Sequence, residues 1–110
     1  MDLRLRTDDS GATPVLLVDG DVDLATLPRL RNALAKLVVD HSGGLVVADL
    51  SEVTLLDDCG LGVLMGAAAH ARGAGGDLAL VCRPGRLRER LTLTGLDRAL
   101  RIVDARQAVA

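Results

Sequence analysis

Hydrophobic and polar residues follow two different periods along the chain, and these periods predict the order of its elements. Residues 45–50 form a short, Val-rich apolar run after two glycines, a pattern typical of a buried strand. Residues 63–72 are rich in Ala and Leu and end at Gly73, as expected of a helix that a glycine terminates. Residues 55–62 lie between them and therefore form a strand-to-helix turn, around which the rest of the chain is organised.

The clearest helical periodicity lies between residues 24 and 39. Leucines recur there at spacings of three and four, which places them along one face of a helix. Pro28 falls in the first turn of this helix, where its missing N–H group breaks no hydrogen bond. We expect the leucine stripe to pack against a core: Leu27, Leu30, Leu34 and Leu37.

Shorter runs complete the predicted order. Strand patterns occur over residues 3–6, 14–18, 77–82 and 99–103, and residues 19–23 form an acidic loop. A third helix follows Pro84 and ends near Gly95. Asp104 caps a last helical turn over residues 105–109. Strands that alternate with helices pair in parallel through right-handed crossovers, while the first two runs form an antiparallel pair. The sequence predicts one α/β domain over residues 1–110. We expect a mostly parallel mixed sheet, an antiparallel N-terminal edge strand, three main helices and a short C-terminal helix.

Composition limits the chemistry that this domain can carry out. The 110 residues are 49% hydrophobic and include no aromatic residue, so Leu, Val and Ala fill the core, which we expect to hold no carboxylate. Without aromatic rings, base-stacking platforms and aromatic cages are excluded. A net charge of −2 gives no overall field that attracts nucleic acid or an anionic membrane.

The ends and the cysteines add further expectations. The first residues lack the apolar core of a signal peptide, and no apolar run is long enough to span a bilayer. Cys59 and Cys82 are too far apart in sequence to indicate a disulfide framework or a metal site. We therefore expect a cytoplasmic protein without a cofactor or a bound metal.

The central turn carries the strongest motif. Residues 56–62 are Leu-Asp-Asp-Cys-Gly-Leu-Gly, which resembles the signature turn of the STAS domain in anti-sigma factor antagonists, also called anti-anti-sigma factors. That family's pattern is an apolar residue, Asp, Ser, Ser or Thr, Gly, Leu and Gly. Asp57 matches the family's Asp, and the residues from Gly60 to Gly62 fix the register. Asp58 then occupies the position of the phosphoaccepting serine, and Cys59 that of a second hydroxyl residue.

A second acidic segment, residues 19–23, also resembles the family. Asp21 and Asp23 match its two acidic positions, although a helix cap explains Asp23 equally well. Thr94 begins a Thr-Gly-Leu that the family also carries, so the resemblance runs from residue 15 to residue 103. The residues that it implies at a partner surface are Asp21, Asp23, Asp57, Asp58, Cys59, Gly60 and Leu61.

The resemblance implies a regulatory protein and not an enzyme. Its implied partner is an anti-sigma factor of the serine-kinase type, and its implied state is a monomer or a weak dimer that binds neither nucleic acid nor a membrane. In the family, phosphorylation of the turn adds about −1.5 to −2 charges and ejects the partner. Asp58 offers no hydroxyl group to such a kinase. It either mimics the released state or belongs with a partner that accepts its charge.

Catalytic interpretations of the turn find little support in the sequence. A nucleophilic Cys59 needs a base within hydrogen-bonding reach, but His70 lies about 16 Å along the same helix at the usual rise. Adjacent aspartates such as Asp57 and Asp58 rarely converge on one metal ion, and no companion ligands accompany them. A phosphoaccepting receiver domain needs a lysine near its last strand, whereas the sole lysine is Lys36.

Other interpretations remain open at this point. The arginines of the third helix are expected to form a solvated face. A STAS scaffold subunit of a stressosome-like or transporter-associated assembly is one alternative function. A thiol redox sensor that acts through Cys59 is another.

Overall fold

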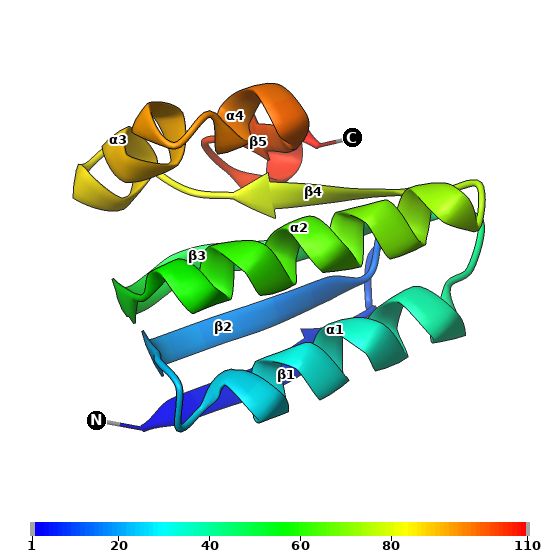
Figure 1. Ribbon diagram of the computed structural model, residues 1–110. Coiled ribbons are helices and arrows are strands. Elements are labelled where there is room, and N and C mark those ends of the chain that lie inside the picture. Colours follow the sequence, from blue (N-terminus) through cyan, green and yellow to red (C-terminus); the bar gives the residue numbers. More distant parts are fainter. Residues whose placement is uncertain (1, 110) are drawn as a thin grey trace.

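A five-stranded sheet forms the centre of the protein, whose computed structural model describes residues 2–109 (Figure 1). β1 and β2 pair antiparallel, and β2, β3, β4 and β5 pair in parallel in that order. This is the mixed sheet that the alternation of strands and helices predicts. The strands are β1 (Leu3–Asp8), β2 (Val15–Val22), β3 (Leu45–Leu56), β4 (Asp77–Val81) and β5 (Arg101–Val103). The helices are α1 (Leu27–Asp40), α2 (Asp58–Gly73), α3 (Arg86–Leu93), α4 (Leu96–Ala99) and the 3₁₀ turn η1 (Arg106–Ala108).

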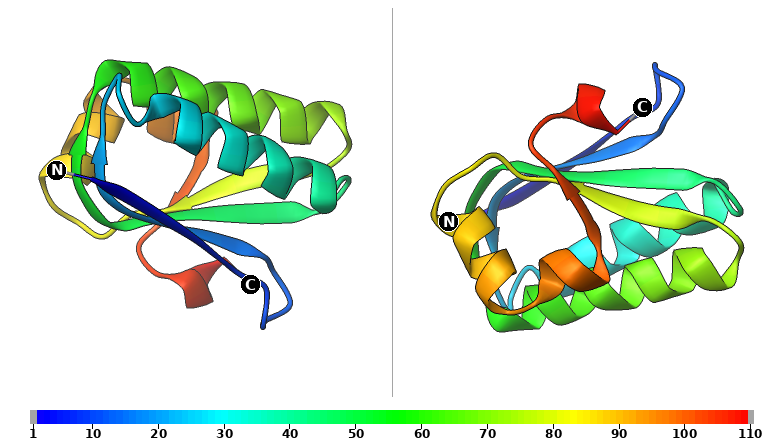
Figure 2. Two further views of the ribbon diagram at one scale, coloured as in Figure 1. Left: turned by 90° about the horizontal axis from the view of Figure 1, so that it is seen from below. Right: turned by 90° about the horizontal axis from the view of Figure 1, so that it is seen from above.

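Helices α1 and α2 lie side by side on one face of the sheet, and η1 lies on the other (Figure 2). The main core fills the space between these helices and the sheet with Leu, Val and Ala side chains, as the composition predicts. The leucine stripe predicted for α1 is buried there and consists of Leu27, Leu30, Leu34 and Leu37. Leu64 and Ala68 of α2 are buried in the same core.

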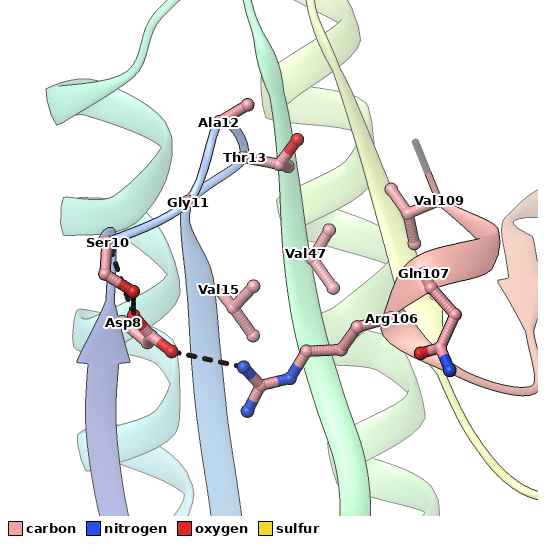
Figure 3. Close-up of a pocket in the computed structure, with 10 residues that line it drawn as sticks. All are labelled: Asp8, Ser10, Gly11, Ala12, Thr13, Val15, Val47, Arg106, Gln107 and Val109. Atoms are coloured by element: carbon pink, nitrogen blue, oxygen red, sulfur yellow. Dashed lines mark hydrogen bonds and ion pairs between the residues drawn. The ribbon is translucent and has the colours of Figure 1, made fainter.

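The C-terminal segment crosses the opposite face of the sheet (Figure 2). Val109 is buried in a second apolar cluster that includes Val15 and Val47. Arg106 reaches Asp8 at the end of β1, and a cavity of about 390 Å³ lies between the segment and the β1–β2 turn (Figure 3). This small cluster ties the end of the chain to the sheet.

Several boundaries differ from the sequence prediction. The strand expected over residues 14–18 continues to Val22, so residues 19–22 are strand and not an acidic loop, because Asp21 pairs with Leu55 of β3. The strand expected from residue 99 begins only at Arg101, because residues 96–99 form α4. Gly95, with φ of +79°, makes the turn that separates α4 from α3.

The predicted ends of two helices are also corrected. α1 begins at Leu27 instead of Leu24, because Thr26 occupies the N-cap position. The expected C-terminal helical turn is the 3₁₀ turn η1, and Asp104 does not cap it, because the Asp104 carboxylate pairs with Arg88 at 2.7 Å. Ala105 takes the capping position without a side-chain hydrogen bond.

The expectation of a core without carboxylates is wrong. Asp21 and Asp49 are 9% and 8% exposed. Each carboxylate has compensating donors: Thr54 Oγ1 donates to Asp21 at 2.5 Å, and the Ser51 backbone N–H donates to Asp49 at 3.0 Å. Within residues 2–109, none of the helices combines the length and the apolar character that crossing a membrane requires.

Candidate functional site

The turn identified in the sequence lies where β2 and β3 end together, since Val22 pairs with Leu56 (Figure 1). The Asp57 backbone N–H donates to the Val22 carbonyl at 2.9 Å, which joins the end of β3 to the end of β2. The Gly60 N–H donates to the Asp57 carbonyl at 2.9 Å and closes the first turn of α2. The backbone of the turn is therefore fixed by both neighbouring elements.

Asp57 and Asp58 take different places in this turn. Asp57 is the N-cap residue of α2 in an extended conformation, but its side chain makes no capping hydrogen bond. Asp58 is the first helical residue of α2 and does not occupy the N-cap position. Its negative charge still lies in the first turn, where the helix dipole stabilises an anion. The half-exposed Asp57 carboxylate has neither a hydrogen bond nor an ion pair within residues 2–109.

The Asp58 side chain is 91% exposed and forms an ion pair with Arg90 of α3. Arg90 Nη2 donates to Asp58 Oδ1. The solvated face expected for the arginines of this helix is not found at Arg90 or at Arg88, which are half-buried and paired. Arg88 Nη1 donates to the Cys82 carbonyl at 3.0 Å and pairs with Asp104. No local pattern links positions 58 and 90, which lie 32 residues apart.

Gly60 is required by packing at the turn. A Cβ atom there would lie 2.6 Å from Leu56 Cδ1 and 2.8 Å from Val22 Cγ1. Leu61, which follows it, is buried at 8% exposure and belongs to the core. Gly60 and Leu61 therefore pack the turn against the interior of the protein.

Cys59 is half-buried and lines a groove between α1 and α2. The groove has a volume of about 510 Å³ and runs from Cys59 past Gly62 and Gly66 to His70. Leucine and alanine side chains of α1 form its other wall. Cys59 is therefore reachable from the groove, next to the turn.

Asp21 and Asp23, the other acidic residues matched to the family, each have a structural partner. Asp21 is buried at the end of β2 and accepts the hydrogen bond from Thr54. Asp23 and Thr26 bond reciprocally: the Asp23 N–H donates to Thr26 Oγ1 and the Thr26 N–H donates to Asp23 Oδ1, each at 3.0 Å. This exchange fixes the start of α1 and thus the shape of the loop beside the turn.

Three leucines remain exposed, although the leucine pattern of the sequence favours burial. Leu24 follows β2, Leu55 is next to last in β3, and Leu93 ends α3 one turn after Arg90. Their exposed fractions are 77%, 46% and 87%. Leucine patterning predicts burial, so only the tertiary structure shows that these three remain outside the core.

The site offers shape, charge and apolar area. Within the described residues, no cluster of three or more His, Cys, Asp or Glu side chains is arranged to hold a metal ion. The carboxylates of Asp57 and Asp58 stand at the start of α2, and the exposed Leu55 lies two residues before Asp57. Such a surface suits the docking of another protein.

Comparisons with known proteins agree with this geometry. The family model described as "Mlab, STAS domain" matches residues 5–104. The anti-sigma-F factor antagonist RsfB of Mycobacterium tuberculosis is 33% identical over 94 residues, which cover 86% of this chain and 75% of that protein. The anti-sigma-B factor antagonist of Listeria monocytogenes is 33% identical over 87 residues, covering 79% and 75% respectively.

A solved structure extends the comparison to three dimensions. The crystal structure of an anti-sigma factor antagonist from Mycobacterium paratuberculosis has a TM-score of 0.86 and 27% sequence identity, covering 97% of this chain and 90% of that one. The turn, the strand order and the sequence match all point to the same family. The chain belongs to the STAS domain family, beside anti-sigma factor antagonists.

Proposed function

We propose that this protein is a non-enzymatic anti-sigma factor antagonist that binds an anti-sigma factor through the turn at residues 57–61 and the edge around it. The observation that supports this most is the exposure of leucines in the segments that carry the turn and Arg90, the arginine that pairs with Asp58. Leu24, Leu55 and Leu93 remain accessible, although each would gain free energy from burial. Exposed apolar side chains next to an oriented charged group are typical of a protein docking surface.

The proposed surface is built on rigid elements. Gly60 and Leu61 hold the turn on the core, and the Asp23–Thr26 exchange holds the loop before α1. Arg88 ties α3 to the end of β4 through the Cys82 carbonyl. Side chains on such a frame are arranged before the partner arrives, which lowers the entropy lost on binding.

Regulation by phosphorylation at the turn is absent in this proposal. A serine kinase transfers phosphate to a hydroxyl group, and Asp58 has none. The partner can still be an anti-sigma factor of the serine-kinase type, because binding and phosphorylation are separate events. We expect the protein itself to be a monomer or a weak dimer.

Calorimetric titration of the full chain against two anti-sigma factors tests the proposal. The two are the anti-sigma-F factor of Mycobacterium tuberculosis and the anti-sigma-B factor of Listeria monocytogenes, the targets that the names of the relatives give. Leu93→Ser is expected to weaken binding about tenfold or more, because it removes apolar area at the surface. Val39→Ser is the matched control, since Val39 is 63% exposed near the far end of α1. Equal losses for both variants contradict the proposed surface.

Incubation with the same anti-sigma factors, ATP and Mg²⁺ tests the regulatory part. We expect no phosphate on the unmodified protein and expect Asp58→Ser to accept phosphate at the turn. Mass spectrometry of the peptide that contains residue 58 measures both. Phosphate anywhere in the turn of the unmodified protein contradicts this part of the proposal.

A further inference from the structure

The charge at residue 58 is balanced within the chain. Arg90 donates to the Asp58 carboxylate, so the residue at the position of the family's serine is paired with a positive group. The Asp58 side chain is 91% exposed and that of Arg90 is 35% exposed. A partner that approaches this position meets an ion pair and not an isolated carboxylate.

Arg90 is held in place by the packing of α3. Leu91, the next residue, is fully buried, and Arg88 anchors the same helix through two hydrogen bonds. The fixed helix keeps the Arg90 backbone close to the start of α2, within reach of Asp58. Figure 2 shows α3 close to the start of α2, which brings the guanidinium to the first turn.

We propose that Arg90 is the residue that determines how Asp58 acts in recognition. By neutralising Asp58, it makes this position resemble an unphosphorylated serine more than a phosphoserine, and binding is therefore constitutive. The inference rests on the proposed function. It decides between the two roles that the sequence leaves open for Asp58.

The charges support this assignment. A phosphoserine adds about −1.5 to −2 charges, which disfavour docking through the cost of desolvation and through repulsion. Asp58 brings −1, and Arg90 compensates it with +1. A paired charge enters an interface without leaving an unpaired group behind, whereas a buried carboxylate that has lost its partner opposes binding. Leu93, one turn after Arg90, places apolar area beside the pair.

Binding of four variants of the full chain to the two anti-sigma factors tests the inference. Arg90→Gln leaves the Asp58 charge uncompensated, so we expect binding weaker by about tenfold or more. Asp58→Asn removes the negative charge but keeps a side-chain oxygen that can accept from the partly solvated Arg90, so we expect its affinity to stay within about threefold of the unmodified protein. The double variant Asp58→Asn/Arg90→Gln is expected to recover that affinity. Arg86→Gln removes a charge from an exposed arginine of the same helix and controls for net charge.

Two results would overturn the inference. Unchanged binding by Arg90→Gln shows that the pairing has no effect on recognition. A double variant as weak as Arg90→Gln shows that Arg90 contacts the partner directly and does not act through Asp58. Urea unfolding of each variant confirms that the compared proteins are folded.

A further result separates this inference from the proposed function. If no form of the protein binds either anti-sigma factor, the proposed function is contradicted and the inference falls with it. If the unmodified protein fails to bind but Asp58→Asn binds, the function stands and the inference alone is wrong. A salt-sensitive coupling between positions 58 and 90 in a double-mutant cycle of unfolding supports the ion pair without any partner, and its absence overturns the inference.

Discussion

Arg106 Nε donates to the Asp49 carboxylate at 3.0 Å, although the two residues lie 57 positions apart in the sequence. The same guanidinium donates from Nη1 to Asp8 at 3.1 Å (Figure 3). Asp49 lies in β3, Asp8 ends β1 and Arg106 begins η1, so one side chain links three segments. The hydrogen bonds hold the C-terminal segment over the second apolar cluster, which Val109 completes.

Arg106→Ala is expected to lower the free energy of unfolding. The Asp49 side chain is 10% exposed and would lose a charged donor, which corresponds to about 1 to 2 kcal/mol after allowance for the partial exposure of Arg106. Urea unfolding followed by circular dichroism measures the change. Asp8→Asn is the control, because Asp8 is the more exposed partner and its loss is expected to matter less. A larger loss for Asp8→Asn contradicts this assignment.

The same link predicts how stability depends on pH. Burial raises the pKa of Asp49, but hydrogen bonds from Ser51 and Arg106 outweigh burial, and the pKa lies below its ordinary value. Hydrogen bonds from Ser10 and then Arg106 likewise lower the pKa of Asp8. Both carboxyls bind protons more weakly in the folded than in the unfolded protein. Their contribution is therefore complete above the unfolded pKa and is lost as pH falls through the lower folded pKa.

Urea unfolding between pH 7 and pH 2.5 measures this loss. We expect stability to fall below about pH 5, where unfolded carboxyls begin to bind protons. Arg106→Ala is expected to show a smaller decline, because Arg106 no longer lowers the pKa of either carboxyl. Parallel curves for the two proteins contradict the prediction.

Replacing either of two glycines of α2 by alanine is expected to have opposite effects on stability, because the space around the two positions differs. A Cβ atom at Gly60 would overlap Leu56 and Val22, so Gly60→Ala is expected to destabilise the protein by about 1 to 3 kcal/mol. A Cβ atom at Gly66 meets no atom within 4 Å, so Gly66→Ala is expected to stabilise it by about 0.5 to 1 kcal/mol.

Thermal and urea unfolding of the two variants, each compared with the unmodified protein, test this pair. Because both changes add one methyl group to the same helix, each is the control for the other. If both variants are destabilised, a Cβ atom at position 66 is not accommodated as the structure indicates. Two stabilised variants would contradict the close packing under the turn.

The sequence predicts those parts of the fold that depend on local pattern, such as the leucine stripe of α1 and the Val-rich run of β3. The glycine stop expected at Gly73 lies two residues too early, because Gly73 is still helical, Ala74 is the C-cap and the positive φ occurs at Gly75. The pairing of Asp58 with Arg90 and the burial of Asp21 against Thr54 depend on which elements become neighbours. No residue near these positions signals such partners in advance. The sequence therefore locates the candidate turn but overestimates its length, because β3 continues to Leu56 and α2 begins at Asp58. The charge balance at the turn was not predicted.

The two cysteines are expected to react differently in the folded protein. Burial raises the pKa of the Cys82 thiol, which is 2% exposed, so it is both inaccessible and protonated at neutral pH. Cys59 is half-buried and lines the groove between α1 and α2. We expect a thiol reagent to modify Cys59 alone in the native protein and both thiols in urea.

Mass spectrometry after brief exposure to iodoacetamide measures which thiol has reacted. Cys59→Ala is the control and is expected to abolish native labelling. Native labelling of Cys82 at the rate seen in urea would contradict its burial. The same preparations test the redox alternative: if Cys59 is a peroxide sensor, peroxide must oxidise it faster than an ordinary exposed thiol and change binding to an anti-sigma factor. An unreactive Cys59 leaves packing beside the turn as its role.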